Sequence, residues 1–237
     1  ALALRDFLWS IPDTHIGFDS SLLDQDFQDE TAGGLGFGIR ETDDGKFIAN
    51  FVLEGGPAAE AGMVWGAEII SLDGVPTGDV VAATIPWSSP FSNPEIKRLQ
   101  QQRYATRFKL EKGEVEVAFK NPEGSEQTAT LAIVNEFDSF NASSFRAGVD
   151  AEALPVEFDM LPSGYGYIKI SSFSDNDLLS ILVWERALQY FNENEVPGII
   201  LDLRNNGGGS GWLADQMAAY FFNEEIVVGQ TAYYDDS

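Results

Sequence analysis

A run of glycines, Gly207 to Gly209, is the first feature of this sequence whose residue types suggest chemistry. The run follows an aliphatic segment, 198–203, that reads as a strand, and it precedes a helical pattern from Gly211. Glycines let the backbone turn its N–H groups toward a ligand, and a helix N-terminus adds a positive partial charge. We therefore expect an anion-binding turn at the end of a strand.

Three uses of such a turn compete, beside a loop that only connects strand and helix. A phosphate cradle is disfavoured because neither G-x-G-x-x-G nor G-x-x-x-x-G-K-[ST] fits NNGGGSGW. A nucleophile elbow needs G-x-S-x-G, but Trp212 holds its last position, and Ser210 is better explained as a helix N-cap. The third use is an oxyanion hole whose donors are backbone N–H groups. The residues alone leave the choice open.

Composition excludes several classes of protein. The chain has 14 Lys and Arg against 38 Asp and Glu, a formal net charge of −24, so we expect no nucleic-acid partner. Cysteine is absent, which excludes disulfides and thiolate metal sites within these 237 residues. A hydrophobic content of 44% is ample for a packed core, and no apolar run approaches the about 20 residues of a membrane-spanning helix.

The periodicity changes along the chain and predicts a mixed α+β protein. We expect an N-terminal arm over 1–31, a β-rich domain over 32–134, a linker with little periodicity over 135–163 and an α/β segment over 164–237. In the arm, a short helix from Leu2 to Trp9 is followed by a separating acidic stretch, DQDFQDE. In the β-rich domain, a helix is predicted over 94–108.

The last segment reads as strand, helix, strand and helix, which implies a parallel βαβ unit with a right-handed crossover. Its first helix is expected to begin at Ser174 as N-cap. Its second strand is almost entirely aliphatic, so we expect it to be covered on both faces.

The segment VPGIILDLRNNGGGSGWLADQMAAYFF resembles the signature of the C-terminal processing (tail-specific) proteases, peptidase family S41. GYGYIKISSFS, one helix upstream, resembles that family's preceding strand. The resemblance implies that 164–237 is the first part of a ClpP/crotonase-like α/β core. It also implies that the N–H of Gly208, with Gly209 second, donates to the oxyanion; Gly207 stands where the family often has Pro.

The N-terminal half carries a second resemblance. GGLGFGI and VLEGGPAAEAGMVWGAEIISLDGVPTGD are similar to the loop and core blocks of bacterial PDZ domains. This implies that Leu35, Gly36 and Phe37 bind the carboxylate of a substrate's C-terminal tail through backbone N–H groups, while the tail adds a strand. The sequence departs from the pattern at Gly66-Ala67 and in a longer insert after Val81.

His15 is the only histidine, in IPDTHIGFD, which resembles a block before the PDZ domain in tricorn-type relatives. The resemblance implies a general base, with Thr14 able to orient it. The residues alone give equal weight to a loop histidine that hydrogen-bonds Asp13. Asp202 and Arg204 are expected to form a structural ion pair beside the glycines.

The resemblance implies a serine endopeptidase, but no segment of the chain matches the family's nucleophile motif. We therefore expect a chain truncated before the nucleophilic serine and inactive by itself, whose partners are protein or peptide C-termini. We expect no metal or organic cofactor, a periplasmic or secreted location and possible self-association. The alternative is a non-catalytic PDZ-containing peptide-binding protein.

Overall fold

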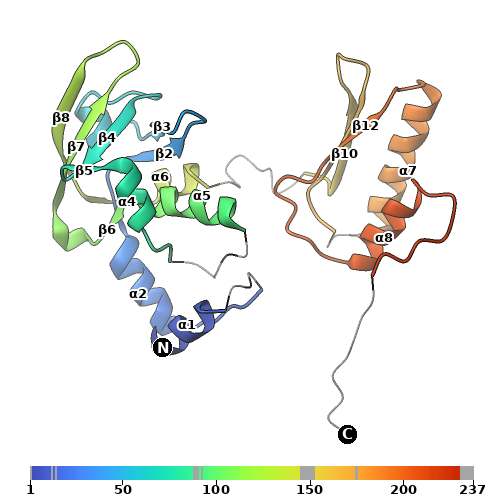
Figure 1. Ribbon diagram of the computed structural model, residues 1–237, viewed down its shortest axis with the longest axis horizontal. Helices are drawn as coiled ribbons and strands as arrows, with labels where there is room; N and C mark the ends of the chain where they lie inside the picture. Colours follow the sequence, from blue (N-terminus) through green and yellow to red (C-terminus); the bar gives the residue numbers. More distant parts are fainter. Residues whose placement is uncertain are drawn as a thin grey trace, which may run out of the picture. The chain divides into compact units, whose positions relative to one another are not determined.

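The computed structural model describes residues 2–11, 13, 15–87, 91, 93–144, 153–173 and 176–229. The chain divides into two compact units, 1–148 and 149–237, and each is described by itself (Figure 1). Helices and several sheets alternate along the chain, so the predicted α+β class is confirmed. The finer domain boundaries drawn from the sequence stay predictions.

Two helices open unit 1, α1 (Leu2–Trp9) and α2 (Ser21–Thr31). The acidic stretch expected to separate the arm from the domain is therefore wrong, because it lies inside α2. Ser20 caps this helix by accepting a hydrogen bond from the Leu22 amide, at 3.4 Å. Leu23 is buried, and the ring of Phe27 lies 6.3 Å from that of Trp87. The apolar face of α2 thus offsets its acidic surface.

An antiparallel sheet with the order β2-β3-β4-β7-β8 forms the body of unit 1. Its strands are β2 (Phe37–Glu41), β3 (Phe47–Val52), β4 (Glu68–Leu72), β7 (Glu114–Lys120) and β8 (Glu126–Ala132), with β5 (Val75–Pro76) paired to β4. A small second sheet has the order β6-β1-β9 and consists of β6 (Arg107–Phe108), β1 (Gly33–Gly34) and β9 (Val134–Asn135).

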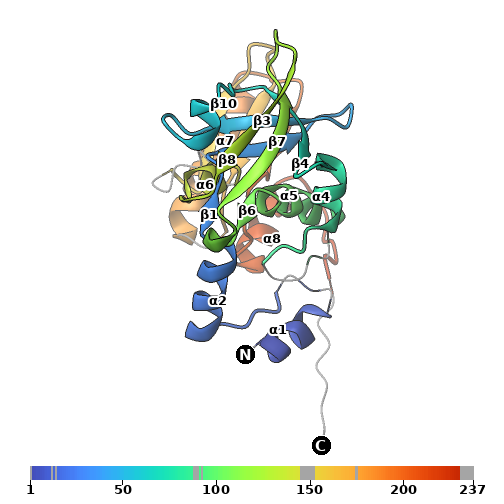
Figure 2. The same ribbon diagram turned by 90° about the vertical axis from the view of Figure 1, so that its left-hand side faces the viewer.

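Short helices surround these sheets, and Figure 2 shows α4 and α5 side by side. They are α3 (Pro57–Glu60), α4 (Thr77–Ala83), α5 (Pro94–Tyr104), the 3-10 turn η1 (Leu110–Lys112) and α6 (Asp138–Ala142). The helix predicted over 94–108 is too long by four residues, because Arg107 and Phe108 leave it to pair with β1. Leu35, Phe37, Ile39, Val117 and Phe119 are among the residues of the buried core.

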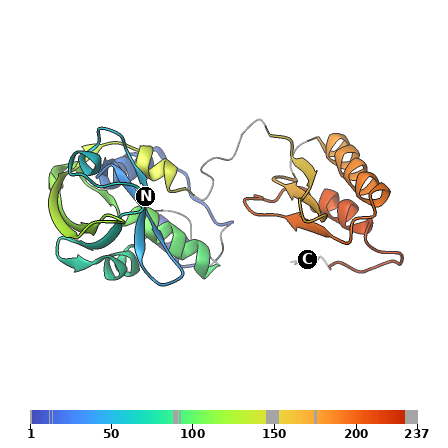
Figure 3. The ribbon, with the colours of Figure 1, turned by 90° about the horizontal axis from the view of Figure 1, so that it is seen from above.

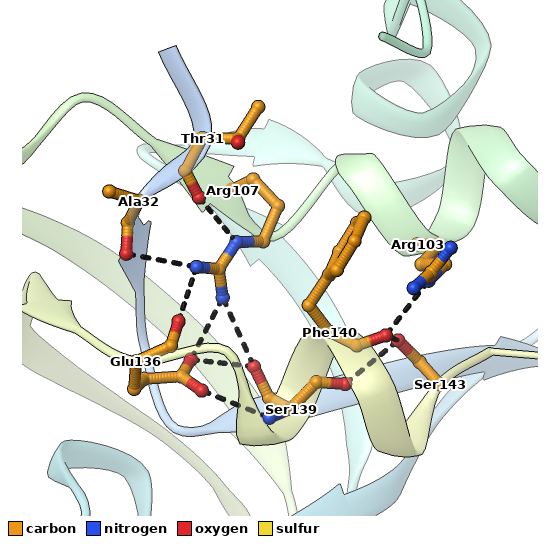
Figure 4. Close-up of polar contacts among 8 residues, drawn as sticks. All are labelled: Thr31, Ala32, Arg103, Arg107, Glu136, Ser139, Phe140 and Ser143. Carbon is orange, nitrogen blue, oxygen red and sulfur yellow. Dashed lines mark hydrogen bonds and ion pairs between the residues drawn. The ribbon is translucent and has the colours of Figure 1, made fainter. Parts of the chain in front are cut away.

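A buried guanidinium joins the small sheet to α2 and α6 (Figure 4). Arg107 donates from Nε to the Thr31 carbonyl at 2.8 Å and from Nη2 to the Ala32 and Glu136 carbonyls. Its Nη1 donates to Glu136 Oε1 at 3.0 Å and to Ser139 Oγ at 3.4 Å. The side chains of Arg107 and Glu136 are only 1% and 5% exposed. The pair is therefore withdrawn from water, and it is stabilised only by these contacts.

The segment 135–163, predicted to be a linker with little regular structure, contains α6 and the strand β10 (Val156–Met160). The prediction is wrong for these elements, because their order comes from contacts that the local pattern does not contain. Ser139 is held by Arg107 and Glu136, and β10 pairs with β11 (Gly166–Ile170) along its whole length.

Unit 2 is a three-stranded sheet with the order β10-β11-β12 and two helices on the same face of it (Figures 1 and 3). Its other elements are α7 (Asp177–Glu193), β12 (Ile199–Asp202) and α8 (Gly211–Ala219). β11 and β12 are parallel, with Ile168 opposite Leu201, so the predicted βαβ unit is confirmed. Trp184, Phe191, Leu213 and Met217 fill the space between helices and sheet.

Two details of unit 2 differ from the prediction. β12 is not covered on both faces: it is the last strand of its sheet, and Ile200 and Leu201 are 47% and 43% exposed. An aliphatic strand is therefore no proof of two-sided cover, since an edge strand can carry the same residues. Ser174, the predicted N-cap of α7, lies outside the described residues, and Asn176 caps the helix by accepting from the Leu179 amide at 3.1 Å.

Removal of one charge from the buried pair should destabilise unit 1. We expect Glu136→Gln to lower its free energy of unfolding by about 3 kcal/mol, because Arg107 would stay buried without a counter-charge. The same change at the exposed Lys46–Glu68 pair, Glu68→Gln, is the matched control and should cost less than about 1 kcal/mol. Global amide hydrogen exchange of β7 measures both values. Equal losses would show that burial gives the pair no special weight.

Candidate functional site

The glycine turn lies where a parallel strand ends and a helix begins. Residues 203–210 connect β12 to α8, and β12 is parallel to its neighbour β11. Ser210 is the N-cap of α8, and its Oγ accepts from the Leu213 amide at 3.2 Å, as the sequence predicts. The turn therefore occupies the end of the sheet at which α/β proteins collect their functional groups.

A charged cluster fixes the start of this turn. Arg204 donates to Asp202 from Nε at 2.9 Å and from Nη2 at 2.6 Å, which confirms the predicted ion pair. The Tyr167 hydroxyl donates to the other side of the Asp202 carboxylate at 2.5 Å. The guanidinium first, and then the phenol, hold the pKa of Asp202 well below its usual range. The hydrogen bond to Asp202 also raises the pKa of Tyr167.

Asn206 ties the middle of the turn to the preceding strand. Its Nδ2 donates to the Ile170 carbonyl, at the end of β11, at 3.0 Å. Its Oδ1 accepts from the Gly208 amide at 2.7 Å, and its own amide donates to the Leu203 carbonyl at 3.0 Å. These bonds give the turn a fixed path across the strand ends.

Gly208 and Gly209 have backbone conformations that only glycine adopts readily, with φ of +92° and +133°. The Gly208 carbonyl accepts from the Phe173 amide at 2.9 Å, and the Ser210 amide donates to the Phe173 carbonyl at 2.8 Å. These two bonds form a short parallel bridge between Phe173 and Gly209. The glycine run is therefore an ordered turn fastened at both ends, not a free loop.

The predicted peptide-binding residues lie in unit 1 at the start of β2. Leu35 and Phe37 are fully buried, so their side chains belong to the core and only their backbones remain for a ligand. Gly36 has φ of +73°, and its carbonyl accepts from the Leu53 amide at 2.7 Å. Just before it, a Cβ on Gly34 would lie 1.8 Å from Glu136 Oε1, so the buried ion pair leaves room only for glycine.

His15 lies in unit 1, in a turn after α1, and its side chain is 90% exposed. Its ring Nδ1 is 2.9 Å from Asp13 Oδ1, and its amide donates to the same oxygen at 2.9 Å. The backbone bond first, and then the ring, lower the pKa of Asp13. This is the pairing expected of a loop histidine, and the role of base stays a prediction. Thr14 lies outside the described residues.

Sequence reasoning missed two residues of the turn. Asn206 had a usable signal, because Asn two residues before Gly is typical of an Asx turn. Tyr167 had none, since its meeting with Asp202 depends on the register of β11 against β12. Across the described parts of the chain, no helix combines the length and apolar character needed to cross a bilayer.

Residues 164–237 match the sequence profile of Peptidase family S41. The "C-terminal processing peptidase, chloroplastic" of Tetradesmus obliquus is 27% identical over 186 residues, which are 76% of this chain and 35% of that protein. The solved structure of mature CPAF complexed with lactacystin has a TM-score of 0.53 at 16% identity, over 91% of this chain and 48% of that chain. A second structure, of mature CPAF, gives 0.50 at 17% identity over 88% and 46%.

The curated relative thus extends well beyond the part that this chain spans, about a third of its length. At these identities the CPAF structures show a shared fold and no more.

Replacement of Arg204 by Gln should raise the pKa of Asp202 toward its ordinary value of about 3.9, because the guanidinium is its main partner. Tyr167→Phe removes the lesser partner and should raise it less. A carboxylate with a lowered folded-state pKa contributes stability above about pH 4, and this is lost as pH falls through the folded pKa. The acid loss of unit 2 stability should therefore shrink in Arg204→Gln. Carboxyl ¹³C titration by NMR measures the pKa, and an unchanged value would contradict the assignment.

Proposed function

Because residues 164–237 belong to peptidase family S41, we propose that this chain carries the tail-binding domain and the oxyanion-stabilising turn of a serine endopeptidase of the C-terminal processing type. The observation that carries the proposal is the ordered glycine turn at the end of parallel β12. Held amides beside a reacting carbonyl stabilise the negative charge that forms on its oxygen. Loss of one such donor typically raises the barrier by about 3 kcal/mol.

The tail-binding part of the proposal rests on β2. This strand is the first of its sheet, so its outer edge is available for an added strand. Gln102 from α5 already accepts the outward amide of Glu41, at 3.0 Å. A substrate tail would therefore pair with the Phe37–Ile39 end, next to Gly36, where backbone amides would hold its carboxylate.

The reaction also needs a nucleophile and a base. The nucleophilic serine would come from beyond the motifs of these 237 residues, so the chain alone should bind tails without cleaving them. His15 would take the serine's proton, and we place the protein in the periplasm or outside the cell. No metal or organic cofactor enters this scheme.

The alternative is a non-catalytic PDZ-containing peptide-binding protein. One observation favours it: the His15 ring is exposed and paired with Asp13, as in an ordinary surface loop. The two functions share tail binding and differ in the role of His15.

A peptide with a free, apolar C-terminal residue should bind this chain and remain intact, while its amidated twin should bind far less. Gly36→Ala should weaken binding about tenfold, because alanine is strained at φ of +73°. Gly45→Ala, at φ of +80° in the open β2–β3 turn, introduces the same strain elsewhere and should leave affinity unchanged. Calorimetry and mass spectrometry report binding and cleavage. Equal affinity for the two peptides would remove tail binding from the proposal.

In a peptide-cleaving protein that contains this chain, His15→Ala should lower kcat at least about 100-fold, the usual contribution of a general base. Asp13→Asn retains the ring and removes only its carboxylate partner, so it should cost much less. Steady-state hydrolysis of a tail peptide measures both. A rate unchanged by His15→Ala would assign the base to another residue.

A further inference from the structure

The side chain of Asn206 is the one polar group in the described part of the turn that joins two separate backbone segments. One end contacts the Ile170 carbonyl, which can only accept, and the other contacts the Gly208 amide, which can only donate. These partners fix the orientation of the side-chain amide, with Nδ2 toward β11 and Oδ1 toward the glycines. Asn206 is half-buried, whereas its neighbour Asn205 is exposed.

The amides of the turn alternate between bonded and free. Those of Arg204, Asn206, Gly208 and Ser210 donate to the Asp202 carboxylate, the Leu203 carbonyl, Asn206 Oδ1 and the Phe173 carbonyl. Among the described residues, the amides of Asn205, Gly207 and Gly209 have no hydrogen-bond acceptor. The bridge to Phe173 uses the Gly208 carbonyl and the Ser210 amide, so the Gly209 amide between them points away from Phe173.

We propose that Asn206 is the positioning residue of the glycine turn: it occupies the Gly208 amide and thereby presents the Gly209 amide as the donor to the oxyanion. This rests on the proposed peptidase function and changes the order of the donors expected from the sequence, in which Gly208 came first. Asn206 itself touches no substrate. It acts by holding Gly208 against β11, so that Gly209 is stationary when charge develops.

Asparagine is required at this position because the cross-link needs a donor and an acceptor on one side chain. Aspartate would still accept from Gly208, but its carboxylate would face the Ile170 carbonyl with no proton to share. Alanine would lose both bonds. The two substitutions therefore separate the two halves of the cross-link.

Solvent-exchange NMR on the ¹⁵N-labelled 237-residue chain tests the proposal. In the wild type, the Gly208 amide should exchange about fivefold more slowly than that of Gly209, as a net hydrogen bond of about 1 kcal/mol requires. Asn206→Ala should bring Gly208 to the rate of Gly209 and speed exchange at Phe173 and Ser210. Asn206→Asp should keep Gly208 slow and speed only Phe173 and Ser210. Asn205→Asp, the same change one residue earlier, should alter none of them.

A pH series distinguishes positioning from general loosening of the fold. Below about pH 4 the carboxyl group that Asn206→Asp introduces gains a proton and can donate to the Ile170 carbonyl again. Protection at Phe173 and Ser210, measured against Asn205→Asp at each pH, should then return. Equal exchange at Gly208 and Gly209 in the wild type, no change in Asn206→Ala, or no recovery in acid would each overturn the proposal.

The peptidase claim fails or survives separately. In a peptide-cleaving protein that contains this chain, Asn206→Ala should lower kcat and leave KM unchanged, because the turn acts on the transition state. Loss of protection at Gly208 with an unchanged kcat would confirm the cross-link and overturn its catalytic role. The expected exchange pattern without any peptidase activity in the wild type would count against the proposed function alone.

Discussion

The parallel pairing of β11 with β12 is the constraint on which the candidate site depends. A parallel pair needs a crossover, which α7 supplies, and it brings the carboxyl ends of both strands to one edge. Ile170 and the residues after Asp202 are neighbours for this reason alone. With an antiparallel pairing, the Ile170 carbonyl would lie at the other end of the strand, and Asn206 would have no partner there.

Glycine and asparagine have complementary tasks in the turn. Gly208 and Gly209 allow backbone angles that other residues resist, but this freedom by itself gives no fixed direction to an amide. The bonds from Asn206 and the bridge to Phe173 remove the freedom after it has been used. A flexible residue type thus contributes a rigid donor, which is what stabilisation of a short-lived negative charge requires.

Unit 1 solves a similar problem with a buried charge pair. Arg107 gathers carbonyls from the end of α2 and the start of β1, and Glu136 balances it while holding Ser139 of α6. The loop at Gly36 begins directly beside this cluster. Its backbone is therefore anchored on the side away from β3, while the core holds the side chains of Leu35 and Phe37. Both candidate loops present backbone amides from rigid surroundings.

Much of this protein was determined by the sequence through local signals. Pro57 opens α3, Ser210 caps α8, and the change from alternating to helical periodicity predicts a β-rich half followed by a βαβ unit. The glycine run after an aliphatic segment predicts a turn at the end of a strand, and the Asp202–Arg204 pair is two residues apart. Each of these features depends on neighbours in the chain, which a sequence displays directly.

Tertiary structure decided the rest, since it depends on contacts between residues far apart. The exposure of Ile200 follows from β12 being the last strand of its sheet, and the aliphatic pattern is the same at an edge as in a centre. Order in 135–163 comes from Arg107 and from β11, neither of which lies in that segment. The bond from Asn206 to Ile170 spans 36 positions and exists only in one register of two strands. Local composition carries no record of such a register, because it is chosen by the packing of the whole unit.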